Sequence, residues 1–181
     1  AFMNLLSEST NAVSQAGRRG ALMLTLSVDH PDIQDFINIK NDATRTKVQY
    51  ANISVLITHE FMQAVIDGTD FDLRYDGTIY RTVRARELWG NIIANAHASA
   101  EPGIIFWDTM KEYHNVEYVN PLTSTNPCGE QPLASYTACN LGNLNLVKFV
   151  RDDGTFDYED LAESTKVATR FLDDVIDYNM D

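Results

Sequence analysis

Cysteine and basic residues are scarce in this sequence, and each shortage excludes a class of protein. Two cysteines in 181 residues cannot form the disulfide framework of a small secreted domain. There are 14 Lys and Arg against 26 Asp and Glu, and the net charge of −12 repels nucleic acids and anionic membranes. No apolar run approaches the roughly 20 residues that span a bilayer. We therefore expect a cytoplasmic protein with reduced thiols and neither a nucleic-acid nor a membrane partner.

The rest of the composition is that of a folded globular protein. Hydrophobic residues make up 44% of the chain and charged residues 22%. The chain starts with Ala rather than Met, and both ends have the apolar spacing of helices. We therefore expect residues 1–181 to be one partial domain that is truncated at both ends.

Apolar periodicity predicts strands that alternate with helices. Strands are expected at residues 21–28, 52–57 and 104–107, with helices at 1–15, 31–37, 58–66, 85–98, 108–114 and 158–178. A hairpin is expected over residues 71–84, with its turn at Asp76 and Gly77. Phe106 lies on an apolar face of its segment, so we expect its side chain in the core. The alternation favours an α/β fold with parallel strands.

Residues 119–143 differ from the rest of the chain, because they hold three of the five prolines and show almost no periodicity. A loop of this length in a compact domain is usually functional. Within it lies Asn126-Pro127-Cys128-Gly129-Glu130, where proline and glycine bend the backbone and present the thiol at a tip. In an extended segment, residues two apart point the same way, so the thiol, amide and carboxylate are expected to converge.

The neighbours of Cys128 indicate the chemistry of its thiol. A nearby carboxylate disfavours a thiolate by like-charge repulsion, whereas a cysteine nucleophile needs a cationic neighbour. The motif is compatible with a thiol that carries a hydrogen atom, with Glu130 as a general base. A buried structural cysteine in a tight turn is the alternative interpretation.

The second thiol, Cys139, lies eleven residues further on, in Cys139-Asn140-Leu141-Gly142. Structural zinc usually needs four ligands, and His97 and His114 are isolated in the sequence, so we predict no metal site. We expect Cys139 to lie near the start of a strand at about Asn143. There it would face Cys128 across a shared cavity without being bonded to it.

Two segments resemble parts of the large subunit of ribonucleotide reductases. The run from Asn126 to Leu133, followed by Cys139-Asn140-Leu141-Gly142, resembles the active-site loop, and it is most similar to the adenosylcobalamin-dependent class II type. The sequence Gly17-Arg18-Arg19-Gly20, followed by Asp29-His30-Pro31-Asp32, resembles the specificity loop and the strand and helix after it. The helix at 169–179 also fits, so the resemblance is colinear over nearly the whole chain.

The resemblance implies a ten-stranded α/β barrel with the radical cysteine on an inner finger loop, and this chain would supply part of that barrel. Cys128 would form the thiyl radical that abstracts the 3′-hydrogen of the ribose. Glu130 would take the 3′-hydroxyl proton, and Asn126 would hydrogen-bond the substrate. Cys139 would be one of two reducing thiols, with its partner before residue 1.

The resemblance also implies cofactors and partners. Adenosylcobalamin would be the radical source, and a ribonucleoside di- or triphosphate would be reduced to a DNA precursor. A dNTP or ATP effector would act through the loop Gly17, Arg18, Arg19 and Gly20, for which a solvated turn is the alternative. A thioredoxin-like protein would be the reductant, and the full-length protein would be a homodimer. Further active-site segments would lie outside the chain, so the fragment alone is expected to be inactive.

Two other functions remain open from the sequence. One is a class I large subunit that receives its radical from a separate subunit. The other is a non-catalytic nucleotide-binding or redox-switch domain that uses Cys128 and Cys139. A thiol switch gives no reason for Asn126 and Glu130 to flank the first cysteine.

Overall fold

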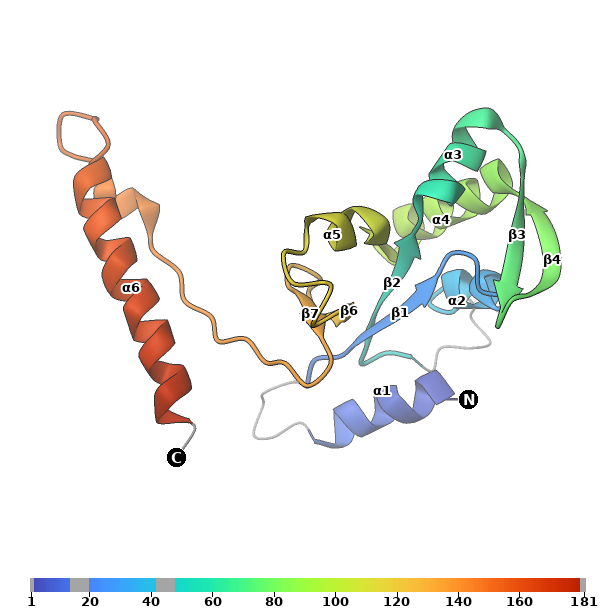
Figure 1. Ribbon diagram of the computed structural model, residues 1–181, viewed down its shortest axis with the longest axis horizontal. Coiled ribbons are helices and arrows are strands. Elements are labelled where there is room, and N and C mark those ends of the chain that lie inside the picture. Colours follow the sequence, from blue (N-terminus) through green and yellow to red (C-terminus); the bar gives the residue numbers. More distant parts are fainter. Residues whose placement is uncertain (1, 14–19, 42–47, 180–181) are drawn as a thin grey trace. The chain divides into compact units, whose positions relative to one another are not determined.

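The computed structural model describes residues 2–13, 20–41 and 48–179. The chain divides into two compact units, one up to Tyr136 and the other from Thr137. Figure 1 shows the order of the helices and strands along the chain. No helix among the described residues is long and apolar enough to cross a membrane.

A three-stranded parallel sheet organises the first unit. Its strands are β1 (Met23–Ser27), β2 (Asn52–Ile57) and β5 (Gly103–Phe106), with β2 in the centre. In this register Met23 lies opposite Asn52, and Ser54 lies opposite Gly103. The parallel strands confirm the α/β prediction, and β2 has its predicted bounds.

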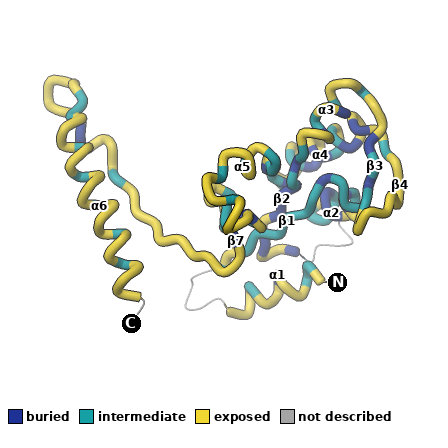
Figure 2. Tube along the Cα trace, in the orientation of Figure 1, coloured by how far each residue is buried: buried dark blue, intermediate teal, exposed yellow. Residues whose placement is uncertain are grey.

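Helices cover one face of this sheet. Side chains alternate along a strand, and Ile53, Val55 and Ile57 of β2 are all at most 1% exposed. They pack with residues of α2 (Ile33–Asn38), α3 (His59–Asp67) and α4 (Ala85–Ser99) in one core. Figure 2 shows this core as the dark segments at the centre of the first unit. Thr58 caps α3 as predicted, since its Oγ1 accepts a hydrogen bond of 3.1 Å from the Phe61 backbone N–H.

A β-hairpin follows α3. Strands β3 (Asp70–Tyr75) and β4 (Thr78–Arg84) pair antiparallel. Asp76 and Gly77 at the turn have φ values of 48° and 74°, as in the primed turns that connect two-residue hairpins. The predicted position of the turn is therefore confirmed.

The remaining elements of the first unit are α1 (Phe2–Ala12), α5 (Trp107–Tyr113) and a second hairpin, β6 (Leu122–Thr125) with β7 (Pro132–Ala134). This second hairpin lies inside the segment that was expected to be an irregular loop. Its strands have only 4 and 3 residues, which is too short for a periodic pattern. Phe106 is 46% exposed, so its predicted place in the core is wrong. It lies at the end of β5, an outer strand of the described sheet.

The second unit contains a short 3₁₀ helix, η1 (Leu146–Phe149), and the long helix α6 (Tyr158–Tyr178). The bounds predicted for α6 are confirmed. Residues 137–145 form no strand, so the strand expected at about Asn143 is wrong. Instead, the Asn145 side chain caps η1 by accepting a hydrogen bond from the Val147 backbone N–H.

Three parallel strands among the described residues account for part of an α/β sheet. The complete ten-stranded barrel with an inner finger loop remains a prediction.

Candidate active site

Cys128 lies at the tip of the β6–β7 hairpin. The Asn126 backbone carbonyl accepts a 3.0 Å hydrogen bond from the Gly129 N–H and closes a four-residue turn. Proline at the second position and glycine at the fourth are favoured in such turns. Gly129 has a φ of 85°, a left-handed conformation that other residues adopt at a cost. The exposed thiol confirms the predicted loop tip and contradicts the alternative of a buried structural cysteine.

The Asn126 and Glu130 side chains meet at the base of this turn. Asn126 Nδ2 donates a hydrogen bond of 2.5 Å to Glu130 Oε1. Asn126 Oδ1 accepts a hydrogen bond of 2.9 Å from the Gln131 backbone N–H. The backbone N–H of Asn126 also donates to the Gln131 carbonyl over 3.0 Å. The amide and the carboxylate therefore converge as expected, although the segment is a turn rather than extended. The convergence of the thiol with them stays a prediction.

The tip of the hairpin is attached to the parallel sheet. Asn52 Nδ2, on the first residue of β2, donates a hydrogen bond of 2.6 Å to the Pro127 carbonyl oxygen. A Cβ added at Gly129 would lie 3.8 Å from the Met23 methyl carbon, at the first residue of β1. Sequence reasoning did not identify Asn52 as part of the site. The one local signal was a polar residue at the start of a mostly apolar strand.

Cys139 has a different setting from the one expected. It is an exposed free thiol. It lies in residues 137–145, where the backbone is irregular and the expected strand does not form. It belongs to the second unit, whereas Cys128 belongs to the first. The proposal that the two sulfurs face one cavity therefore stays a prediction.

Most of the predicted specificity loop, Gly17, Arg18 and Arg19, lies outside the described residues. Gly20 is described, and it is irregular backbone before β1. A Cβ at this position would be 2.6 Å from the Thr10 backbone oxygen on α1, so a larger residue would force the two segments apart. Gly20 therefore fixes how closely the end of this loop approaches α1.

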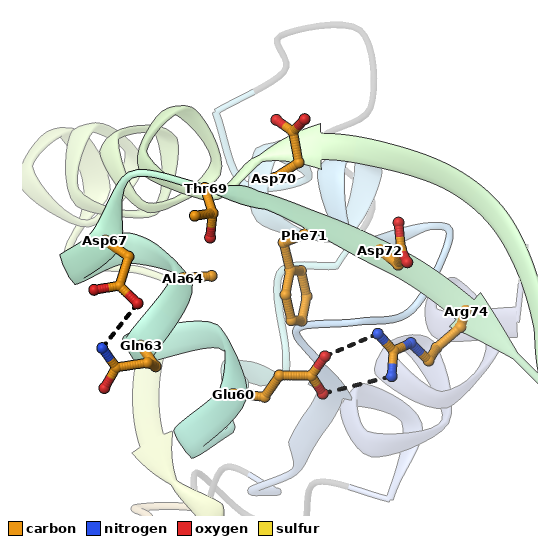
Figure 3. A pocket seen from close by; sticks show the side chains of 9 residues that line it. All are labelled: Glu60, Gln63, Ala64, Asp67, Thr69, Asp70, Phe71, Asp72 and Arg74. Carbon is orange, nitrogen blue, oxygen red and sulfur yellow. Dashed lines mark hydrogen bonds and ion pairs between the residues drawn. The ribbon is translucent and has the colours of Figure 1, made fainter.

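A groove of about 490 Å³ lies between α3 and β3 (Figure 3). Its carboxylates all have partners. Glu60 pairs with Arg74, Asp67 accepts from Gln63, Asp70 pairs with Arg84, and Asp72 accepts from Thr82. We therefore interpret the groove as a set of surface hydrogen bonds and ion pairs. In the described part of the chain, no three His, Cys, Asp or Glu side chains are grouped to hold a metal ion.

The comparisons with known proteins agree with this geometry. The family model for the ribonucleotide reductase barrel domain matches residues 1–181. The vitamin B12-dependent ribonucleoside-diphosphate reductase of Thermoplasma acidophilum is 42% identical over 98% of this chain and 23% of its own length. The protein of that name from Mycobacterium tuberculosis (strain CDC 1551 / Oshkosh) is 40% identical over 97% of this chain and 26% of its own.

A third relative, the vitamin B12-dependent ribonucleotide reductase of Streptomyces coelicolor, is 34% identical over 95% of this chain and 21% of its own length. The chain thus spans about a quarter of the length of these relatives. The match with the family model nevertheless covers the whole chain, including the hairpin that presents Cys128. This chain therefore belongs to the ribonucleotide reductase barrel-domain family.

Proposed function

We propose that the protein containing this chain reduces ribonucleotides to 2′-deoxyribonucleotides, with Cys128 as the thiol that abstracts the 3′-hydrogen. One observation carries the proposal: an exposed cysteine at the tip of a sheet-anchored turn, with an amide and a carboxylate hydrogen-bonded at its base. Two of the relatives are named ribonucleoside-diphosphate reductases, which favours a diphosphate as the substrate.

Each residue of the turn has a role in this reaction. A Cys128 thiyl radical takes the hydrogen atom from C3′, and Glu130 accepts the proton of the 3′-hydroxyl. The 2′-hydroxyl then leaves as water. Cys139 and a second thiol outside the chain supply two electrons and two protons and form a disulfide. Cys128 finally returns its hydrogen atom to C3′, Glu130 returns its proton to the 3′-oxygen, and the radical is regenerated on sulfur.

Asn126 orients two groups in this scheme. Its amide donates to the Glu130 carboxylate, and in the proposed reaction it would also hydrogen-bond a substrate hydroxyl. Holding reacting groups at attack distance lowers an activation barrier by roughly several kcal/mol. In the proposal, the turn holds the base and the thiol on the same side of the substrate.

We propose adenosylcobalamin as the radical source, because the relatives are named vitamin B12-dependent. Bound adenosylcobalamin supplies a radical that removes the hydrogen atom of a thiol. The exposure of Cys128 fits this role, since a thiol buried in the core would be out of reach. None of the described residues is assigned as a contact to the cofactor. A class I arrangement with a separate radical-generating subunit is the less favoured alternative.

The remaining partners belong to the same proposal. A dNTP or ATP effector acts through residues 17–20, a thioredoxin-like protein reduces the disulfide, and the full-length protein is a cytoplasmic homodimer. The alternative redox switch between Cys128 and Cys139 does not account for the hydrogen bond that fixes Glu130.

The test uses the full-length parent protein with adenosylcobalamin, a ribonucleoside diphosphate and a dithiol. Cys128→Ser is expected to form no deoxyribonucleotide. Glu130→Gln is expected to lower kcat by roughly 10²–10⁴-fold, the usual contribution of a general base. Glu163→Gln is the matched control, because Glu163 is 70% exposed and pairs with Lys166 on the same helix. Deoxyribonucleotide formation by Cys128→Ser at the wild-type rate would refute the proposal.

A further inference from the structure

The attachment of the Cys128 turn to the sheet depends on a few atoms at one end of two strands. Asn52 and Met23 are the first residues of β2 and β1, and they lie opposite each other in the sheet register. The Asn52 backbone N–H donates to the Leu22 carbonyl over 2.8 Å, so the backbone of this residue is fixed by the ladder. The side chain of Asn52 therefore starts from a rigid position.

The orientation of Asn52 follows from the alternation of β2. Ile53, Val55 and Ile57 face the helices, so Asn52 faces the opposite side of the sheet. From that side its Nδ2 reaches the Pro127 carbonyl at 2.6 Å, across 75 residues of sequence. The Pro127 carbonyl belongs to the peptide unit whose nitrogen is that of Cys128. The hydrogen bond therefore fixes the peptide that orients the Cys128 Cα–Cβ bond.

The other hydrogen bonds of the turn do not supply this constraint. The hydrogen bonds that Asn126 makes with Glu130, Gln131 and Gly129 all lie within the hairpin. They set the shape of the turn, but none of these bonds joins it to the sheet. The bond from Asn52 joins the turn to the sheet.

We infer that Asn52 is a positioning residue for the radical thiol, acting through the Pro127 carbonyl rather than on the substrate. This inference rests on the proposed role of Cys128. Hydrogen abstraction needs the sulfur at a defined distance from C3′, and a misplacement of about 1 Å can slow such a reaction by about 10²-fold. Losing the Asn52 amide therefore displaces the thiol and lowers kcat, while substrate-binding groups outside the turn hold KM near its wild-type value.

Three substitutions in the full-length parent protein separate donor chemistry from shape. Asn52→Ala removes the donor, and Asn52→Asp keeps the shape but replaces the amide with a carboxylate that cannot donate. Asn52→Gln keeps the donor on a chain one methylene longer. Asn115→Asp is the matched control for charge, because Asn115 is exposed and lies outside the turn and the sheet.

We expect kcat to fall at least tenfold in Asn52→Ala and Asn52→Asp, with KM for the ribonucleotide within twofold of wild type. Asn52→Gln should recover part of kcat, and Asn115→Asp should leave it unchanged. Hydrogen–deuterium exchange of the substrate-free proteins gives an independent readout. Peptides that contain residues 129 and 131 should exchange faster in Asn52→Ala and Asn52→Asp, whereas peptides of α4 should not change.

Three results would overturn the inference. One is a kcat within twofold of wild type in both Asn52→Ala and Asn52→Asp. Another is a raised KM at unchanged kcat, which would make Asn52 a substrate contact. The third is a fall of activity in parallel with the unfolding temperature, without recovery in Asn52→Gln. Cys128→Ser, assayed in the same series, distinguishes a failure of the Asn52 inference from a failure of the proposed function. If it is inactive while the Asn52 variants are normal, only the inference fails; if it is active, the proposed function fails.

Discussion

Gly129→Ala tests whether the shape of the Cys128 turn matters for the site. Gly129 has a φ of 85°, and a side chain in the left-handed region costs about 1–2 kcal/mol. The added methyl group would meet only the Met23 methyl carbon, at an ordinary contact distance of 3.8 Å. The substitution therefore strains the backbone without creating a clash, and its effect should be confined to the turn.

The expected result is a local loss of stability. A cost of about 1–2 kcal/mol raises the ratio of open to closed turn by roughly 5–30-fold. In the full-length parent protein, backbone amides 129 and 131 should exchange faster by that factor if they open locally. Exchange in β2 and α4 should be unchanged. The assay is hydrogen–deuterium exchange followed by mass spectrometry of short peptides.

Gly129→Asn is the matched control, because asparagine tolerates left-handed backbone better than alanine does. It should lose clearly less protection than Gly129→Ala, although its side chain is larger. Equal protection in wild type and Gly129→Ala would refute the argument from backbone strain. Equal losses of amide protection in the alanine and asparagine variants would indicate that the presence of a side chain matters, rather than the left-handed backbone conformation.

Two further predictions concern the scaffold and α6. In Gly103→Ala, a Cβ would lie 2.8 Å from the buried Ser54 Oγ. The free energy of unfolding, measured with urea, should therefore fall by about 1–3 kcal/mol. Adding Ser54→Ala should recover part of that loss, and a purely additive double variant would contradict the contact. In α6, the Asp160 backbone N–H and the Arg151 side chain lower the pKa of the Asp157 carboxyl, against the opposing effect of desolvation. Because the folded-state pKa is the lower one, this stabilisation is fully present above the ordinary aspartate pKa of 3.8 and is lost as the pH falls through the folded pKa. After correction for the intrinsic pH dependence of amide exchange, the protection of amides in the first turn of α6 should therefore fall on acidification below about pH 4, and Asp157→Asn should remove that loss of protection.

Local sequence signals predicted much of the fold. The alternation in residues 52–57 predicted β2, Asp76 and Gly77 predicted the turn of the β3–β4 hairpin, and Thr58 predicted the start of α3. Each signal resides in residues adjacent along the chain. The same holds for α6, whose 21 residues are long enough to show a helical period.

What the sequence did not predict depends on contacts between distant segments. Asn52 is part of the site because of one hydrogen bond to Pro127, and nothing near either residue indicates that pairing. The exposure of Phe106 depends on which strands lie beside β5. The motif around Cys128 was recognisable because Asn126, Cys128 and Glu130 are neighbours in the chain. The strand expected after Cys139 was wrong, because a capped 3₁₀ helix, η1, begins at Leu146 instead.

The central claim is that Cys128 removes the 3′-hydrogen of a ribonucleotide. The most direct measurement is a competition between 3′-protiated and 3′-deuterated ribonucleoside diphosphate in the full-length parent protein with adenosylcobalamin and a dithiol. The products are quantified by mass spectrometry. The account predicts that wild type favours the protiated substrate in kcat/KM and that Cys128→Ser forms no deoxyribonucleotide from either. Deoxyribonucleotide formation by Cys128→Ser at a rate near that of wild type would contradict it.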